Sequence, residues 1–281
     1  MRLSRHVKEH PMSLAAHALG QLSSVRSRQH VEVVRMSAIR LLKTRYRGTA
    51  LGVLWSFANP LLLTGLYTAI FGTAFASYYG GSITRYVFSA FVGVAVVTFF
   101  SQATTEALTT VVGNGGLLNK IALDPETFPI AAIAANAFQQ ITTTFPVVML
   151  LSAFLTHDPI RVLLVPVVFA GVLLLCTGFG LTLATLYVFF RDLLYLWGVI
   201  AFIIWMTCPV FYPAALVPAG VRPWLTMNPV GMGIGALREV ALGRGPIEYG
   251  LVGQFLVVAA ACALIGHTIF RTLQRDFMDL L

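Results

Sequence analysis

Charged side chains are scarce in this sequence. Only 11% of its 281 residues are Asp, Glu, Lys or Arg, whereas 57% are hydrophobic and the mean hydropathy is +0.81. Soluble domains carry about 25% charged residues, because their surfaces face water. A chain with less than half that content exposes most of its surface to lipid, so the composition predicts an integral membrane protein.

The sequence also lacks the motifs of several chemistries. It contains no GxxxxGK[ST] loop for nucleotide phosphates, no HExxH helix, no pair of carboxylates within an apolar stretch and no Ser–His–Asp arrangement. Its three cysteines stand singly in apolar stretches, and its six histidines form no ligand pair. We therefore expect no catalytic residue, no metal site and no cofactor in this chain.

Charge-poor intervals mark six segments long enough to cross a hydrocarbon core of about 30 Å, which takes roughly 20 apolar residues. The predicted fold is all-α and integral to the membrane, with six transmembrane helices. They are placed at about 57–78, 86–112, 128–156, 162–190, 193–211 and 249–270. Residues 212–248 are too polar and too rich in proline to span, which favours short re-entrant helices at the outer face between spans five and six.

Lys and Arg are distributed unevenly along the chain. Ten of the 19 lie within the first 47 residues, and with a cytoplasmic N-terminus the cytoplasmic segments hold 14 of them while the outer loops hold five. Membrane proteins carry such an excess in their cytoplasmic loops, so we predict a multi-pass protein with both termini in the cytoplasm. A basic block beside a span also suits anionic membrane lipid better than nucleic acid. Lipid is therefore an expected partner, and nucleic acid is not.

Residues 31–47 differ from the predicted spans. Their apolar side chains recur at helical spacing on one side, and their basic side chains lie largely on another. This pattern is typical of an amphipathic helix in the plane of the membrane, and by itself it favours a surface anchor with no other task. The predicted organisation is a basic cytoplasmic segment 1–30, an amphipathic helix 31–47 and a transmembrane domain 48–281.

Two features within the predicted spans could carry function. Glu106 is the one Asp, Glu, Lys or Arg in a span, and its place about two turns from the cytoplasmic end favours snorkelling to water over a proton relay. Tyr67, Phe71 and Phe75 recur every four residues and share one face of the first span. Aromatic ring faces suit the C–H faces of sugars, although packing between helices is the more common cause of such a stripe.

Five stretches of the sequence, in order, resemble the ABC-2-type permeases that export polysaccharides such as O-antigen, teichoic acid and other cell-envelope glycans. They are Arg45–Trp55 with Asn59 and Pro60; Phe99–Val111 with Asn114, Leu117, Leu118 and Lys120; Arg191-Asp192-Leu193; Asn228-Pro229 with Arg238 and Glu239; and Phe270-Arg271 with Phe277, Asp279 and Leu280. The chain departs from the family pattern at Leu41, where an acidic residue is usual. It also lacks the arginine of the usual Phe-Pro-Arg-Glu at Leu123-Asp124-Pro125-Glu126.

The resemblance implies a transport subunit, not an enzyme. It implies a homodimer in the bacterial cytoplasmic (inner) membrane, joined by two separate ABC ATPase subunits that hold ATP and Mg and drive a lipid-linked polysaccharide outward. For coupling to the ATPase it implies Gly115, Gly116, Leu117, Leu118, Asn119, Lys120, Ile121, Ala122 and Glu126. For the interface helix it implies Arg40, Lys43, Arg45, Tyr46 and Arg47. For the lining of the path it implies Trp55, Tyr67, Phe71, Phe75, Phe202 and Trp205. For an outer gate it implies Asn228, Pro229, Arg238 and Glu239.

Two other functions stay open at the level of sequence. An ABC-2 permease that exports a lipid, drug or antibiotic would have the same architecture. A membrane-embedded enzyme acting on polyprenyl-linked substrates would need acidic or histidine clusters for metal or phosphate chemistry. Asp124 and Glu126 are the only close acidic pair, which makes the enzyme the weaker alternative.

Overall fold

The computed structural model describes residues 31–50, 52–118, 123–221, 223, 225 and 227–279. Within these residues the chain is helical or irregular and contains no strand, so the protein is all-α as predicted. The basic segment 1–30 lies outside the described residues. So do four of the residues assigned to coupling: Asn119, Lys120, Ile121 and Ala122.

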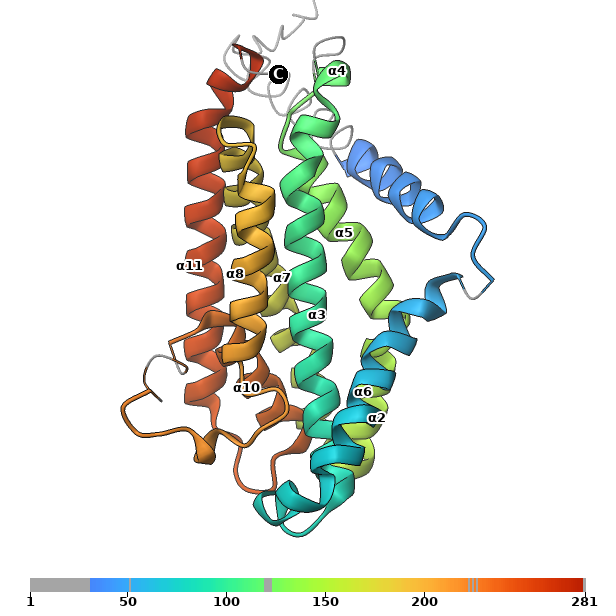
Figure 1. Cartoon of the computed structure of the whole chain (residues 1–281), viewed down its shortest axis with the longest axis vertical. Coiled ribbons are helices and arrows are strands. Elements are labelled where there is room, and N and C mark those ends of the chain that lie inside the picture. The colour runs from blue at the N-terminus through green and yellow to red at the C-terminus, as the bar shows by residue number, and fades with distance from the viewer. Residues whose placement is uncertain are drawn as a thin grey trace, which may run out of the picture.

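Four helical segments are long and apolar enough to cross a membrane, and they stand side by side in Figure 1. The first is Gly52–Tyr79, made of η1 (Gly52–Leu54), α2 (Trp55–Phe75) and η2 (Ala76–Tyr79). The others are α3 (Ile83–Gly113), α7 (Pro159–Phe189) and α11 (Tyr249–Leu273), the last followed by η4 (Gln274–Asp279). Each covers a segment in which the sequence predicts a span.

The segment predicted as one span at 128–156 is two helices, α5 (Thr127–Thr142) and α6 (Thr144–Thr156), with a bend of 43° between them. Pro146 explains the break, because it has no N–H to donate to the carbonyl of Thr142 four residues earlier. A bend of this size leaves the chain travelling in one direction. With the pair counted as one, up to five segments have the length and composition of a span.

Helix α8 (Leu193–Thr207) ends four residues before the predicted end at 211. Cys208 is extended, with φ −70° and ψ 136°, because the residue before a proline is disfavoured in the helical region and Pro209 follows. At 1.5 Å per residue the 15-residue helix is about 22 Å long, shorter than a hydrocarbon core of about 30 Å. The extended backbone after α8 therefore needs partners for its polar groups.

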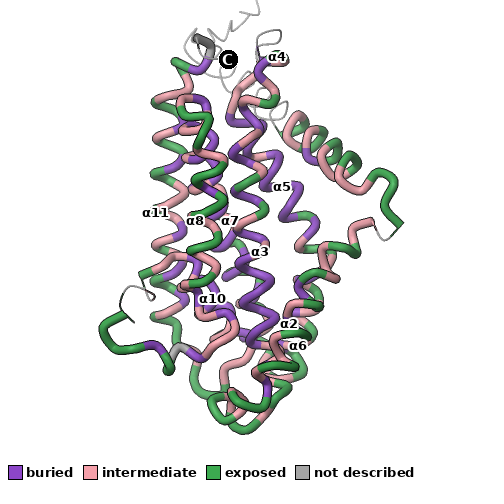
Figure 2. The backbone as a smooth tube through the Cα atoms, in the orientation of Figure 1, coloured by how far each residue is buried: buried purple, intermediate pink, exposed green. Residues whose placement is uncertain are grey.

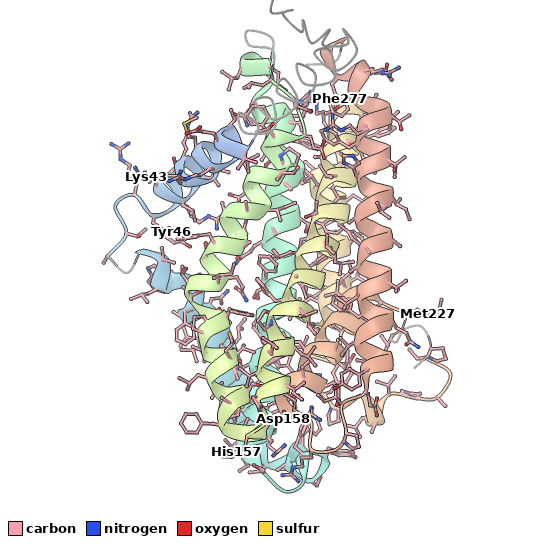
Figure 3. The ribbon with its side chains drawn as sticks, turned by 180° about the vertical axis from the view of Figure 1, so that it is seen from behind. Lys43, Tyr46, His157, Asp158, Met227 and Phe277 are labelled. Carbon is pink, nitrogen blue, oxygen red and sulfur yellow. The ribbon has the colours of Figure 1, made fainter. Side chains whose placement is uncertain are left out.

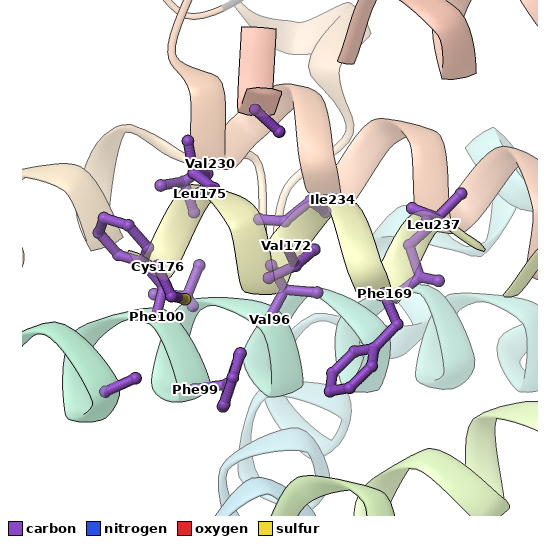
Figure 4. Packing of buried hydrophobic residues seen from close by; sticks show 14 of the residues in the cluster. Val96, Phe99, Phe100, Phe169, Val172, Leu175, Cys176, Val230, Ile234 and Leu237 are labelled. Atoms are coloured by element: carbon purple, nitrogen blue, oxygen red, sulfur yellow. The ribbon is translucent and has the colours of Figure 1, made fainter. Parts of the chain in front are cut away.

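The core lies where α3, α7 and α10 (Pro229–Leu242) meet. Figure 2 shows α3 buried along most of its length, whereas α2 and α11 expose much of their surface. Figure 4 shows the packing of this core, in which α3, α7 and α10 each contribute apolar side chains. Labelled there are Val96, Phe99, Phe100, Phe169, Val172, Leu175, Cys176, Val230, Ile234 and Leu237. At 14 residues α10 is too short to span.

The two ends of the bundle are defined by its turns. One end carries α4 (Gly115–Leu118), the turn between α7 and α8 and the C-terminal helix η4. The other end carries the turns from η2 to α3 and from α6 to α7. Figure 3 shows Phe277 at the first end, with His157 and Asp158 at the second. Arg191, Arg271 and Arg275, which the sequence analysis counts as cytoplasmic, lie in or beside the elements of the first end, so we call it the basic end and the second the outer end.

Candidate functional site

The helix of residues 31–46 leans obliquely against the basic end of the bundle (Figure 1) and is held there by Arg45 and Tyr46. The Arg45 guanidinium forms an ion pair with Glu106, and its Nη1 also donates to Asn136 Oδ1 at 3.1 Å and to Gln139 Oε1 at 2.6 Å. The Tyr46 hydroxyl donates to Gln139 as well. We call these five residues the anchor cluster.

The anchor cluster gives Glu106 protein partners that the sequence did not predict, while its side chain stays partly exposed on an open cavity. The Glu106 side chain is 25% exposed and accepts hydrogen bonds from Arg45 and from Asn136. Burial disfavours the charged form of Arg45, but the hydrogen bond and the negative charge of Glu106 outweigh it, so the pKa of Arg45 is raised. The carboxylate in the span is therefore half of an ion pair that joins α3 to the helix of residues 31–46.

The other three interface-helix residues, Arg40, Lys43 and Arg47, are exposed. Together with Met36 and Ile39 they line a shallow groove of about 390 Å³ on the side of the helix away from the anchor cluster. The described part of the helix thus has one face bound to the bundle and one basic face that is free.

Helix α3 carries a polar stripe, which we define as Thr98, Ser101, Gln102, Thr105, Glu106 and Thr109. All six are partly or fully exposed, whereas almost every other residue from Tyr86 to Val111 is buried. Polar side chains are costly against hydrocarbon and are found where a helix faces protein or water. The stripe therefore marks the face of α3 that meets something other than lipid.

A cavity of about 670 Å³ opens over the part of the polar stripe nearer the basic end, between α3, α2 and the end of the helix 31–46. Trp55, predicted to line the path, is 52% exposed and lies on the wall of this cavity. We call it the Trp55 cavity. Its described lining is Arg45, Tyr46, Trp55, Ser56, Asn59, Ser101, Gln102, Thr105, Glu106, Thr109 and Gln139.

A second hollow of about 280 Å³ continues along α3 toward the outer end. It is lined by Ser101 and Gln102, which also line the Trp55 cavity, and by Phe202 and Trp205 of α8. The polar stripe is thus flanked by α2 on one side and α8 on the other. Three of the path residues predicted from the sequence, Trp55, Phe202 and Trp205, lie along it.

The remaining path residues form a row of aromatic rings beyond the second hollow. Trp205 meets Phe211 edge to face at 6.0 Å between ring centroids, and Phe211 stacks on Tyr67 at 3.4 Å. Tyr67, Phe71 and Phe75 follow as a stack, with centroid separations of 6.0 Å and 5.5 Å. The row joins α8 to α2 and leads to the outer end. These rings are half-buried, so packing on one another covers part of each ring and leaves part exposed.

Arg238 of α10 supplies the partners that the extended backbone after α8 needs. It is partly buried and donates to the carbonyl oxygens of Pro209 at 2.6 Å, Val210 at 2.8 Å and Ser89 of α3. The Tyr86 hydroxyl satisfies the next carbonyl, that of Phe211, at 3.0 Å. Within the described residues no carboxylate pairs with Arg238, so carbonyl dipoles surround its charge.

The other three outer-gate candidates also fix α10 in place. Pro229 occupies the first turn of α10, and Asn228 caps it by accepting from the N–H of Val230 at 3.0 Å. Glu239 faces Arg161 of α7, with Oε1 3.5 Å from Arg161 Nη1. Arg161 also donates to the carbonyl oxygens of Glu239 and Gly245, near the C-terminus of α10, where a cation is favoured by the helix dipole.

At the basic end lies the short helix α4, formed by Gly115, Gly116, Leu117 and Leu118, four of the residues predicted to couple to an ATPase. Leu118 is buried in a cluster with Phe128, Phe270 and Phe277, which ties α4 to α5 and to the C-terminal segment. Glu126 is almost fully buried rather than presented on the surface: Arg271 Nη2 lies 2.6 Å from its Oε2, and His267 Nδ1 lies 2.7 Å from its Oε1. Arg271 also pairs with Asp124 at 2.9 Å.

Comparison with known proteins identifies the family. The family described as ABC-2 type transporter matches residues 32–242. The chain belongs to this family. Two O-antigen export system permease proteins RfbA of Klebsiella pneumoniae are 24% identical to it over 245 and 241 residues, in each case 85% of this chain and 91% of the relative. The O-antigen export system permease protein RfbA of Myxococcus xanthus is 27% identical over 178 residues, 63% of this chain and 67% of the relative.

Membership of the ABC-2 family makes the chain a membrane transport subunit and not an enzyme. The acidic pair Asp124 and Glu126, which the enzyme alternative would need, is bound to Arg271 and His267 of the same chain. That arginine also supplies the positive charge that the sequence lacks between Asp124 and Glu126.

The polar stripe of α3 is the part of the site that the sequence reading missed. The signal was present, because positions 98, 101, 102, 105 and 109 are spaced by three and four and therefore share one helix face. A search for charged residues does not detect the stripe, since only Glu106 in it is charged. Asn136 and Gln139 were also missed, because only the fold brings them to Arg45.

Proposed function

We propose that this protein is the transmembrane subunit of an ABC exporter that moves a lipid-linked polysaccharide outward across the bacterial cytoplasmic membrane. The observation that carries the proposal is the polar stripe with its two hollows and the aromatic row beyond them, in a chain of the ABC-2 family. The similarity to O-antigen permeases over 85% of the chain supports a polysaccharide as the cargo.

In this proposal the chain crosses the membrane six times, with α5 and α6 as one bent crossing, α8 as a short one, and α10 as a re-entrant helix from the outer face. Both termini are cytoplasmic. Two copies form the exporter, with their polar stripes facing a shared path, because one copy leaves the stripe open along its length. A homodimer removes that stripe from lipid.

Energy comes from two separate ATPase subunits that bind ATP and Mg. They dock at the basic end on the coupling segment 115–122 and on the exposed basic face of the helix 31–46, with Glu126 positioned by Arg271 behind the coupling segment. ATP binding shifts the dimer between closed and open states only if the ATPase binds the two states with different affinity. Residues Asn228, Pro229, Arg238 and Glu239 hold α10 as the outer gate of the path.

Depletion of the protein tests this function. We expect a lipid-linked glycan to accumulate on the cytoplasmic side, identified by extraction and mass spectrometry, with recovery on re-expression. Accumulation of a different class of molecule, such as a phospholipid or an antibiotic, would contradict the glycan assignment while leaving the transport role. Co-purification of an ATPase subunit that hydrolyses ATP tests the partner in the same preparation.

A further inference from the structure

We propose that the Trp55 cavity binds uncharged sugar residues of the exported glycan before they enter the path, and that it does not bind the phosphate of the lipid carrier. The inference rests on the proposed function and deepens it, because it names the part of the cargo that the cavity takes. Four observations on the cavity carry it: charge, hydrogen-bonding groups, an exposed ring and continuity with the path.

The charged side chains that line the cavity bind each other. Its described lining contains one cation, Arg45, and one anion, Glu106, and these pair with each other. The guanidinium is further occupied by Asn136 and Gln139. A phosphate or pyrophosphate group that bound Arg45 in the cavity would lie beside the Glu106 carboxylate, which is paired with the same guanidinium. Like charges placed so close are disfavoured, so the cavity selects against an anion.

The groups that stay free for a ligand are neutral. Asn59, Gln102 and Thr105 are exposed on the cavity wall, and none of their side chains is used by a described hydrogen bond. Amides and hydroxyls can both donate and accept, as the hydroxyl groups of a sugar do. A site built from such groups recognises hydroxyls and rejects ligands that leave its polar groups unpaired.

Trp55 supplies the apolar surface that a sugar ring also needs. Its side chain is 52% exposed on the same wall, so the ring is available to a ligand. The face of an aromatic ring carries negative charge and attracts the slightly positive C–H groups of a pyranose. Most of the side chains that line the cavity end in an amide or a hydroxyl group, and a lipid chain placed there would leave these groups without hydrogen-bond partners.

Size and position also fit a polymer. The volume of about 670 Å³ lies within the range of about 300 to 1,000 Å³ typical of ligand sites. Ser101 and Gln102 continue into the hollow beside Trp205, from which the aromatic row leads to the outer end. A sugar chain held on Trp55 could therefore advance along the polar stripe without leaving hydrogen-bonding partners.

Fluorine NMR on the full chain in lipid nanodiscs tests this site directly. The four tryptophans are labelled as 5-fluorotryptophan, and the Trp55 signal is assigned from Trp55→Phe. Maltotriose, a neutral trisaccharide, is expected to shift the Trp55 signal and leave that of Trp197, which is 3% exposed, unchanged. Inorganic pyrophosphate is expected to shift neither. A shift of Trp55 with pyrophosphate and none with maltotriose overturns the proposal.

Variants locate the binding site on the wall. Gln102→Met and Thr105→Val keep side-chain size but remove hydrogen-bonding groups, so each should weaken maltotriose binding roughly tenfold, the equivalent of about 1.4 kcal/mol. Thr142→Val is the matched control, since Thr142 is exposed on α5 outside the cavity and its hydroxyl bonds to Phe138. An unchanged Trp197 signal shows that each variant is folded. Equal affinity in all three variants overturns the site.

The outcomes separate this inference from the proposed function. If maltotriose does not shift the Trp55 signal but depletion causes glycan to accumulate, the sugar site is overturned and the exporter function stands. Binding of maltotriose without glycan accumulation overturns the exporter and, with it, the assignment of the site to an exported glycan.

Discussion

Arg45, Arg161, Arg238 and Arg271 each join elements that are distant in the sequence. Arg45 reaches α3 and α5, Arg161 reaches the end of α10, and Arg271 reaches the start of α5. A guanidinium has five donors in a fixed plane and stays charged, so one side chain can satisfy several acceptors at once. In a bundle with few charges, these contacts set how short or broken segments lie against the long helices.

The pairing of Arg45 with Glu106 leads to a first prediction. Arg45→Met and Glu106→Gln should each lower the thermal unfolding temperature in detergent, because each leaves a polar partner without its match. The double variant should lose less than the sum of the two, with a coupling of about 1 kcal/mol, since both side chains are about a quarter exposed and water weakens the pair.

Arg40→Met is the control for that cycle, because Arg40 is exposed on the same helix. It should leave the unfolding temperature unchanged. Strictly additive losses for Arg45→Met and Glu106→Gln would mean that the two side chains are not coupled in the folded protein.

Arg238 gives a second prediction. Its Nε, Nη1 and Nη2 donate hydrogen bonds to the carbonyl oxygens of Ser89, Pro209 and Val210. The compact ammonium group of a lysine cannot reach all three oxygens. Arg238→Lys should therefore destabilise the protein by about 1.5 to 3 kcal/mol, the worth of one charged hydrogen bond. Chemical unfolding in detergent measures it. Arg244→Lys, at an exposed position in the following loop, should change stability by less than about 0.5 kcal/mol.

At the scale of elements, α7 and α11 touch backbone to backbone. A Cβ atom on Gly266 would lie 2.1 Å from the carbonyl oxygen of Gly178, and one on Gly178 would lie 2.3 Å from that of Cys262. Small residues allow such close approach of helices in membranes, where packing rather than the hydrophobic effect drives association. Helices α7 and α11 are therefore in direct backbone contact at Gly178 and Gly266.

A third prediction follows for that contact. Gly266→Ala should force the two helices apart and cost about 1 to 3 kcal/mol or more, because the colliding atoms are backbone and cannot turn aside. Gly253→Ala is the matched control on α11, since a Cβ there meets nothing within 4 Å. It should be neutral or stabilising, as alanine favours helix over glycine by up to about 1 kcal/mol. Thermal unfolding of both variants in one detergent decides the comparison.

The elements differ in how far the sequence predicts them. Charge-free length predicts α2, α3, α7 and α11 well, because a long apolar run has few alternatives to a helix. The bend at Thr143 and the early end of α8 depend on Pro146 and Pro209, and a rule based on length ignores them. The hydrogen-bond partners of Arg238 lie as far as 149 residues away along the sequence, so no local sequence pattern predicts them. The α2 and α8 residues predicted to line the path come from family resemblance. The polar stripe between them was missed, although the spacing of its polar residues is visible in the sequence.

At the scale of the whole molecule, the number of crossings depends on α5–α6 and α8. If α5 and α6 cross once, the α6–α7 turn lies outside. If they were a re-entrant loop, that turn would return to the cytoplasmic side. Figure 1 shows the start of α5 and the end of α6 toward opposite ends of the bundle, which agrees with one bent crossing.

Cysteine labelling in intact cells tests this topology. Cys176, Cys208 and Cys262 are first replaced by alanine, because they lie within the bundle. Ile160→Cys, in the exposed first turn of α7, and Gly245→Cys, between α10 and α11, should react with a membrane-impermeant maleimide added outside. Gly116→Cys of α4 and Asp192→Cys of the α7–α8 turn should react only after the membrane is opened. If Ile160→Cys reacts only after the membrane is opened, α5–α6 is a re-entrant loop and α7 runs in the opposite direction. The prediction of six crossings would then be wrong.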